Sequence, residues 1–225
     1  MSDITIYWAS GSPFAWRAVL TAELKGIDYE SVLISFQDGD NTKPDYLKMN
    51  PRGKVPVLRA GNEFIYESLA VMAYLERAFP DPPLFGESAL ETARIWQCIS
   101  EHESYLGPET SRIVGPAFFG TADAQADSIR EARQNVHREL ARLEATAAEG
   151  EFLQGDRITA ADVVYYPSIQ VLLRAAAKPA MEQFDLGLLP LADRYPHLGA
   201  WKTRLDALPA CKKTLPPHWK ERAVP

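Results

Sequence analysis

A strand interrupted by a proline constrains the fold of this chain more than any other feature. The segment Lys54-Val55-Pro56-Val57-Leu58 has the composition of a buried strand, but its proline has no N–H to donate to a sheet ladder. X-Pro is also the one peptide bond that takes the cis form at modest cost. Soon afterwards, Glu67-Ser68 precedes a helical run. Helix N-termini bind anions, so the two segments indicate a site for a small peptide-like anion on an α/β sheet.

The start of the chain has a similar arrangement. Residues 4–8 (Ile-Thr-Ile-Tyr-Trp) are typical of a strand, and a helical pattern follows over 13–25. Ser12 stands at the N-cap position of this helix and is followed by a proline at the first helical position. A second strand over 29–35 completes a β-α-β unit. Ser12 is therefore either an ordinary helix cap or a hydrogen-bond donor to a ligand.

The pattern of elements divides the chain into two domains. In addition to the elements above, we expect helices over 43–49 and 68–78 and strands over 55–59 and 63–66. The cluster Pro80-Asp81-Pro82-Pro83 cannot continue a helix and indicates a linker over 80–86. Only helical spacing follows, with helices predicted over 88–106, 123–148, 160–176, 186–193 and 197–208 and a loop over 115–120. The sequence thus predicts an α/β domain over 1–79 and an all-helical domain over 87–225.

The helix predicted over 160–176 begins with a second cap. Thr159 precedes it, and Asp162 stands three residues later, so that its carboxylate reaches back to the cap N–H in a capping box. The helix is apolar nearly all round, as a central buried helix is. Losing such a cap costs ~1 kcal/mol or more. We expect Asp162 to serve folding and to have no place in an active site.

Composition and charge exclude several classes of function. A formal net charge of −6 argues against a nucleic-acid partner. No apolar stretch approaches the ~20 residues of a membrane span, and the early strand leaves no room for a signal peptide, so we expect a cytoplasmic protein. Cys98 and Cys211 lie in no metal-ligand cluster, which predicts reduced thiols and no metal, with a disulfide between them as the alternative. His102 and His137 are expected to face solvent.

Four segments, taken in order, resemble the soluble glutathione S-transferase family over nearly the whole chain. Ser12-Pro13-Phe14 is similar to the catalytic turn of its serine-type classes, and Val55-Pro56 to its cis-proline segment. Glu67-Ser68 is similar to the pair that holds the γ-glutamyl end, and residues 155–162 to the C-terminal folding motif. The motifs are closest to tau- and zeta-like bacterial members. The resemblance implies a thioredoxin-like N-terminal domain, a C-terminal helical bundle and a homodimer.

The resemblance also implies a reaction, with glutathione as co-substrate. Ser12 would stabilise the glutathione thiolate for attack on a hydrophobic electrophile or a peroxide, and Ser10 is the alternative donor. The residues expected to bind glutathione are Ser12, Phe14, Lys54, Val55, Pro56, Glu67 and Ser68. The residues expected to line the second-substrate pocket against the helical domain are Trp8, Ser10, Tyr105, Pro116 and Phe118. The tail segment Pro216-Pro217-His218-Trp219 either covers the cleft or lies on the surface.

Two other functions stay open. Trp16-Arg17 and the segment 25–29 resemble zeta-class members, which include glutathione-dependent isomerases of the maleylacetoacetate type, although the Ser-Ser-Cys turn usual there is absent. The second alternative is a non-catalytic ligand-binding or scaffold protein of the same fold. A pure scaffold has no need to keep Ser12, Pro56, Glu67 and Ser68, so their presence argues against this alternative.

Overall fold

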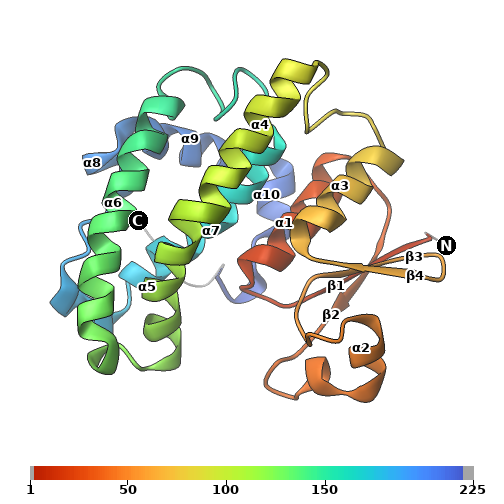
Figure 1. Cartoon of the computed structure of the whole chain (residues 1–225), viewed down its shortest axis with the longest axis horizontal. Helices are drawn as coiled ribbons and strands as arrows, with labels where there is room; N and C mark the ends of the chain where they lie inside the picture. The colour runs from red at the N-terminus through yellow and green to blue at the C-terminus, as the bar shows by residue number, and fades with distance from the viewer. Residues whose placement is uncertain (1–2, 220–225) are drawn as a thin grey trace. The chain divides into compact units, whose positions relative to one another are not determined.

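The computed structural model describes residues 3–219, whose contacts divide them into two units (Figure 1). The first unit consists of residues 3–84 together with 209–219, and the second unit consists of residues 85–208. Residues 1–2 and 220–225, which the predicted domains include, lie outside the described residues. The sequence pattern does not reveal that 209–219 pack with the first unit.

A four-stranded mixed sheet organises the first unit, in the order β2-β1-β3-β4. β1 pairs in parallel with β2 and antiparallel with β3, and β3 pairs antiparallel with β4. The elements are β1 (Ile4–Trp8), α1 (Pro13–Leu24), β2 (Glu30–Leu33), α2 (Pro44–Met49), β3 (Val57–Ala60), β4 (Glu63–Tyr66) and α3 (Ser68–Ala78). The predicted thioredoxin-like domain is confirmed. β3 begins two residues later than predicted, because Pro56 has no N–H for the ladder.

The core of the first unit lies between the sheet and two helices. Ile6 of β1 and Leu58 of β3 are paired across the strands, and both are fully buried. Leu20 of α1 and Leu75 of α3 are also fully buried, and the two helices lie side by side (Figure 1). Burial of such side chains contributes roughly 1.5–3 kcal/mol each. The core therefore fixes the positions of the two helix N-termini.

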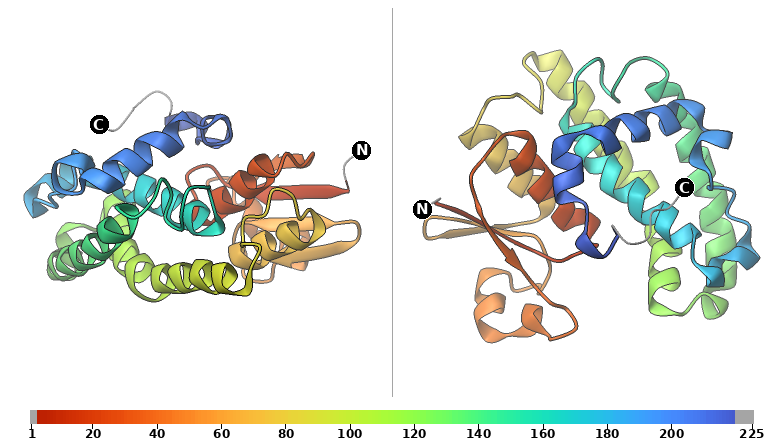
Figure 2. Two further views of the ribbon diagram at one scale, coloured as in Figure 1. Left: turned by 90° about the horizontal axis from the view of Figure 1, so that it is seen from above. Right: turned by 180° about the vertical axis from the view of Figure 1, so that it is seen from behind.

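The C-terminal segment completes the first unit. It contains α10 (Pro209–Thr214) and a short turn over Pro217–Trp219, and Figure 2 shows it beside α1. Trp16 Nε1 donates a 2.8 Å hydrogen bond to Thr214 Oγ1, and Lys213 Nζ lies 2.8 Å from Glu23 Oε2. The Trp219 ring meets the Trp16 ring edge-on, with centroids 5.5 Å apart. Trp219 is therefore buried against α1 and does not lie on the surface.

The second unit is entirely helical, as predicted. Its helices are α4 (Ala89–Glu101), α5 (Gly107–Phe119), α6 (Ala126–Ala147), α7 (Ala160–Ala176), α8 (Leu191–Arg194) and α9 (Pro196–Ala207), with a π-helical turn over His102–Leu106. α7 is buried along almost its whole length. No helix among residues 3–219 is both long and apolar enough to cross a membrane.

The predicted capping box of α7 is confirmed, and Asp162 does more than close it. Its Oδ2 accepts from Thr159 N at 2.8 Å and from Thr159 Oγ1 at 3.0 Å. Its Oδ1 accepts from Leu153 N at 3.0 Å and from Trp201 Nε1 at 2.8 Å. Burial raises the pKa of this carboxyl group, and the four donors act in the opposite direction. Asp162 thus joins α7, α9 and the loop before α7.

Two predictions about helix ends in the second unit are wrong. The loop predicted over 115–120 is helical through Phe119, with Pro116 inside α5, and the helix ends at Gly120 in the left-handed region (φ 70°). Packing of α5 against α6 and α7 outweighs the local preference of proline. In the helix predicted over 186–193, only residues from Leu191 on are helical. Pro190 disfavours helical backbone at the residue before it.

The expectation that two histidines face solvent is also wrong. His102 is 2% exposed, and its ring packs edge-on against Tyr165 with centroids 4.8 Å apart. His137 is half-buried between α6 and the segment before α8. Its Nδ1 lies 2.7 Å from the Tyr195 hydroxyl, and its Nε2 lies 2.8 Å from the Leu186 carbonyl oxygen. Both rings serve packing within the second unit.

Both cysteines are expected to be unreactive in the folded protein. Cys98 and Cys211 are both buried and are not joined in a disulfide, so the disulfide alternative is wrong. Burial, with a smaller contribution from the Asp162 carboxylate, raises the pKa of the Cys98 thiol to about 12. Since the thiolate is the reactive form, a chromogenic disulfide reagent at about pH 8 should label neither cysteine before unfolding and both afterwards. Rapid labelling of the native protein would contradict this burial.

Candidate active site

The register of the sheet brings the predicted glutathione-binding segments together. Tyr7 pairs with Val57, and Val57 pairs with Tyr66. These residues lie near the end of β1, at the start of β3 and at the end of β4. The segments that adjoin them therefore meet at one end of the sheet; they are residues 9–12, 54–56 and 67–68.

The first of these segments is a tight turn that leads into α1. Ser12 N donates to Ala9 O at 3.2 Å, and Gly11 has a φ of 86°, as the third residue of a type II turn requires. Ser12 then caps the helix, its Oγ accepting from Ala15 N at 3.2 Å. A hydroxyl that accepts in this way keeps its own proton for donation. Ser12 is thus able to cap α1 and to donate to an anion at the same time.

The other serine of the turn has a different partner. Ser10 Oγ lies 2.8 Å from His218 Nδ1, in the C-terminal segment of the same unit. The Ser10 hydroxyl is therefore held by an imidazole. Only Ser12 stands at the helix N-terminus, where the partial positive charge of α1 favours an anion.

The second segment presents backbone that α2 holds in place. The Val55–Pro56 peptide bond is cis. The Lys54 carbonyl oxygen accepts from Tyr46 Oη and from Asn50 Nδ2, both at 2.8 Å. Burial raises the pKa of the Tyr46 phenol to about 12, so this group stays a donor at neutral pH. Val55 and Pro56 are buried, whereas Lys54 is exposed.

The third segment places a carboxylate and a hydroxyl before and at the start of α3. Glu67 has a φ of 70° and a ψ of 119°, a conformation that side-chain-bearing residues rarely adopt. Such strain costs about 1–3 kcal/mol and clusters at ligand sites. The Glu67 side chain is 70% exposed and lies 3.8 Å from Arg52 Nε. Ser68 is the first residue of α3, and its Oγ accepts from Arg17 Nη1 at 3.3 Å.

Positive charge dominates this end of the sheet. The N-termini of α1 and α3 both lie there, and Arg17 is 1% exposed beneath them, with its guanidinium 4.9 Å from the centre of the Phe14 ring. Arg52 and Lys54 add exposed cations. Glu67 supplies the carboxylate that an ammonium group requires. This arrangement suits a zwitterionic peptide that carries carboxylates and a thiolate.

Three residues of this region were not among those predicted to bind glutathione. The sequence does distinguish Arg17, because it is a lone cation in the apolar run of α1. A buried cation normally has a specific task. Arg52 lies in a turn, and nothing local distinguishes it. His218 lies 208 residues from Ser10 in the sequence, so no local pattern connects the two.

The five residues predicted for the second-substrate pocket divide between the units. In the first unit, Trp8 donates from Nε1 to Ser31 Oγ at 2.7 Å and lines a cavity of about 350 Å³ beside the C-terminal segment, and Ser10 contacts His218. In the second unit, Tyr105 is 55% exposed and Pro116 is buried. Phe118 is 43% exposed, with Lys178 Nζ 4.5 Å from the centre of its ring.

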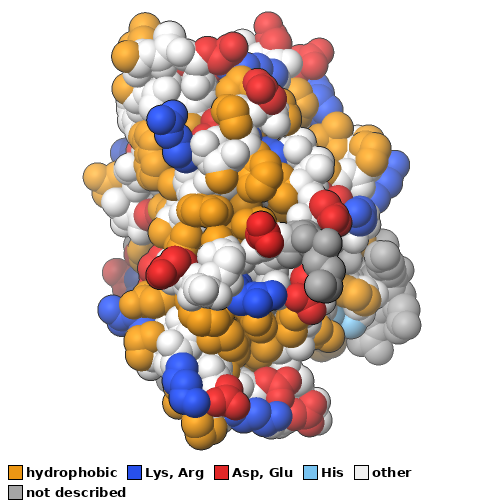
Figure 3. Space-filling model, turned by 90° about the vertical axis from the view of Figure 1, so that its right-hand side faces the viewer, with side chains coloured by type: hydrophobic (Ala, Val, Ile, Leu, Met, Phe, Trp, Pro, Cys, Tyr) orange, Lys and Arg blue, Asp and Glu red, His pale blue; other side chains and the backbone are white. Residues whose placement is uncertain are grey.

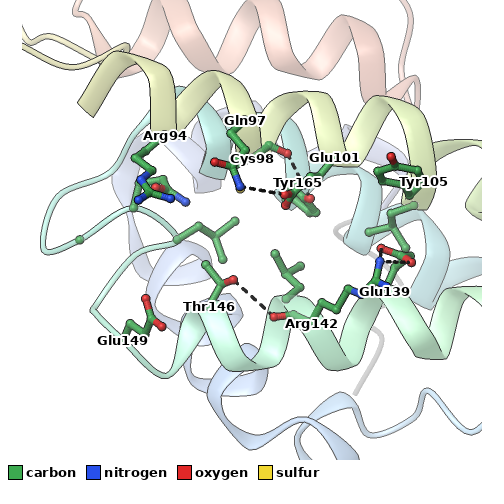
Figure 4. Close-up of a pocket in the computed structure, with 15 residues that line it drawn as sticks. Arg94, Gln97, Cys98, Glu101, Tyr105, Glu139, Arg142, Thr146, Glu149 and Tyr165 are labelled. Carbon is green, nitrogen blue, oxygen red and sulfur yellow. Dashed lines mark hydrogen bonds and ion pairs between the residues drawn. The ribbon is translucent and has the colours of Figure 1, made fainter. Parts of the chain in front are cut away.

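A separate cavity of about 760 Å³ lies within the second unit, between α4 and α6 (Figure 4). Its lining carries charged groups: Arg94, Glu101, Glu139, Arg142 and Glu149. Of the five second-substrate candidates, Tyr105 alone lines this cavity. A lining with so many charges differs from the apolar pocket that a hydrophobic electrophile requires.

This chain is similar to known proteins in both sequence and structure. The family models for the glutathione S-transferase N-terminal and C-terminal domains match residues 11–78 and 126–204. Glutathione S-transferase 4 of Zea mays is 32% identical over 217 residues, 93% of this chain and 91% of its own. A glutathione S-transferase from the Antarctic clam Laternula elliptica is 29% identical with a TM-score of 0.84, covering 100% of this chain and 97% of its own. URE2P6 from Phanerochaete chrysosporium, in complex with oxidized glutathione, is 26% identical with a TM-score of 0.79, covering 98% and 96%.

Proposed function

Because this chain belongs to the glutathione S-transferase family and is a glutathione transferase, we propose that it uses a serine-type site in which Ser12 stabilises the glutathione thiolate. The observation that carries the proposal is the register Tyr7–Val57–Tyr66, which brings three ligand segments to one end of the sheet. A scaffold protein or an isomerase of the maleylacetoacetate type is not favoured. The closer likeness to tau- and zeta-like members stays a prediction.

Each part of glutathione has a proposed partner at this end of the sheet. The cysteinyl backbone pairs with Val55 as an added strand would. The γ-glutamyl ammonium binds Glu67, and its carboxylate binds Ser68 at the N-terminus of α3. The glycyl carboxylate binds Lys54. Phe14 lies over the Arg17 guanidinium and forms part of the wall.

The chemistry follows from the position of the Ser12 hydroxyl. A free thiol has a pKa near ~8.5, so only a few per cent is thiolate at neutral pH. One charge-assisted hydrogen bond and a helix N-terminus together supply the ~2–3 kcal/mol that lowers the pKa by ~1.5–2 units. The thiol proton goes to solvent water. The thiolate then forms a C–S bond with the electrophile, and the leaving group departs with the electron pair of the bond that breaks.

Exposed apolar side chains carry the proposals for the second substrate and the assembly. We propose Tyr105 and Phe118, which expose aromatic surface, as contacts for a hydrophobic electrophile.

Figure 3 shows hydrophobic side chains gathered on the molecular surface between charged ones. The large exposed ones of the first unit are Phe14, Leu33, Phe36, Leu47, Phe64 and Phe79. We propose that part of this surface is covered in a homodimer. Two reduced cysteines fit a cytoplasmic protein.

Titration calorimetry with glutathione tests the proposed site. The Glu67→Gln variant should weaken binding about tenfold, because it removes the ion pair with the ammonium group. Glu63→Gln is the matched control. Glu63 is an exposed glutamate at the start of β4, and Glu67 directly follows the other end of that strand. A glutathione analogue without the amino group should bind the wild type about tenfold more weakly than glutathione, with no further loss in Glu67→Gln. Absence of glutathione binding would refute the proposed site.

A further inference from the structure

We propose that His218 is a positioning residue for thiol activation, acting through the turn that carries Ser12. The proposal rests on the role proposed above for Ser12. It assigns part of the catalytic apparatus to the C-terminal segment of the chain, which lies beside the turn within the first unit.

The imidazole of His218 lies within hydrogen-bond distance of Ser10 and stands where a side chain on Gly11 would project. Its Nδ1 lies 2.8 Å from Ser10 Oγ. A Cβ atom added to Gly11 would lie 3.3 Å from Cε1 and 3.5 Å from Nε2 of the same ring. Gly11 therefore has two reasons to be glycine, its φ of 86° and the ring that lies against it. The ring covers the middle of the turn between Ala9 and Ser12.

His218 is itself held in place by residues that lie before and after it in the sequence. On one side, Thr214 accepts the Trp16 indole hydrogen bond at 2.8 Å. On the other side, Trp219 is 3% exposed and packs edge-on against Trp16. Trp16 belongs to the helix that Ser12 caps. The segment that carries His218 is thus fixed to the same helix whose N-terminus holds the proposed thiolate donor.

The contacts of His218 restrict how the turn can move. Glycine backbone is otherwise free to adopt several conformations, and each would aim the Ser12 hydroxyl differently. The imidazole removes this freedom by packing on Gly11. It also holds the Ser10 hydroxyl, which would otherwise compete for the sulfur. The expected contribution of His218 is a higher fraction of thiolate on the enzyme, with the bound peptide held as before.

The test is the pKa of enzyme-bound glutathione, followed by thiolate absorbance against pH. We expect His218→Ala to raise this pKa by about half a unit to one unit and to lower kcat/KM about threefold to tenfold near pH 6.5, the effect of one hydrogen bond. His218→Asn should restore most of the effect, since an amide places a polar atom where Nδ1 stands. The double variant with Ser10→Ala should lose no more than the larger single loss, because the two residues act as a pair.

Lys213→Ala separates positioning from simple loosening of the segment. This variant breaks the ion pair with Glu23 without touching the turn, and it should leave the thiol pKa unchanged. The proposal is overturned if His218→Ala has the wild-type pKa, if Lys213→Ala reproduces its effect, or if the losses with Ser10→Ala add. If Ser12→Ala alone raises the pKa, only the role of His218 fails. If neither variant raises it, the role of Ser12 fails as well.

Discussion

Replacing Ser12 by alanine is expected to lower kcat/KM by up to about 25- to 50-fold near pH 6.5, the fall in the thiolate fraction of bound glutathione when its pKa rises from ~6.5–7 to ~8.5. The hydroxyl is the one side-chain donor of the turn that stands at the N-terminus of α1. Glutathione affinity should change much less, since the other subsites are intact. Steady-state kinetics and the thiol absorbance titration measure the two effects separately.

The same substitution also removes a helix cap, which needs its own control. Ser12 Oγ accepts from Ala15 N at 3.2 Å, and Ser88 Oγ accepts from Glu91 N at 3.2 Å at the start of α4. Ser88→Ala should therefore cost the same ~1 kcal/mol of stability without loss of activity. Ser12→Thr keeps a hydroxyl and should retain most of the activity. A Ser12→Ala enzyme with a wild-type thiol pKa, or a larger loss in Ser10→Ala, would contradict the role of Ser12.

Replacing Asp162 by alanine is expected to cost about 3–5 kcal/mol of unfolding free energy. The change leaves four donors, on Thr159, Leu153 and Trp201, without the acceptor that they share in a fully buried site. Each buried donor that loses its partner costs about 1–3 kcal/mol, and water reaching the vacated space offsets part of the sum. Urea unfolding followed by circular dichroism measures the loss.

Two further variants define the origin of this loss. Asp156→Ala changes an exposed aspartate in the preceding loop and should shift stability by less than about 0.5 kcal/mol. Asp162→Asn keeps the shape but turns an amide N–H₂ toward donors, so an intermediate loss is expected. A loss below about 1 kcal/mol for Asp162→Ala would show that the cap alone accounts for its contribution.

The sequence revealed the parts of the site that depend on local chemistry. A proline in a strand, a serine before a helix and a carboxylate–hydroxyl pair are each visible within a few residues. The same holds for the cap formed by Thr159 and Asp162. The sheet register then places Ser12, Pro56 and Glu67 at one end, which follows from strand order and not from any single motif.

The remaining features depend on partners that lie far away in the sequence. Hydrophobic periodicity shows which face of a helix is buried, but not what covers it. Nothing near Asp162 indicates that Trp201 binds it, and nothing near Ser10 indicates His218. Pro116 misled the prediction for a related reason, because packing against α6 and α7 decides its conformation. The sequence therefore identified donors and caps more reliably than their tertiary partners.

The return of residues 209–219 to the first unit has a consequence for biosynthesis. The ribosome makes residues 3–84 first and this segment last among the described residues. At ~5–20 residues per second, the interval is on the order of ten seconds, during which the α1 surface around Trp16 stays uncovered. In this interval, a nascent chain has the sheet and the Ser12 cap, but its Ser10 hydroxyl does not yet have His218 as a partner. The turn that carries Ser12 therefore gains its contact with His218 only after residues 209–219 have been made.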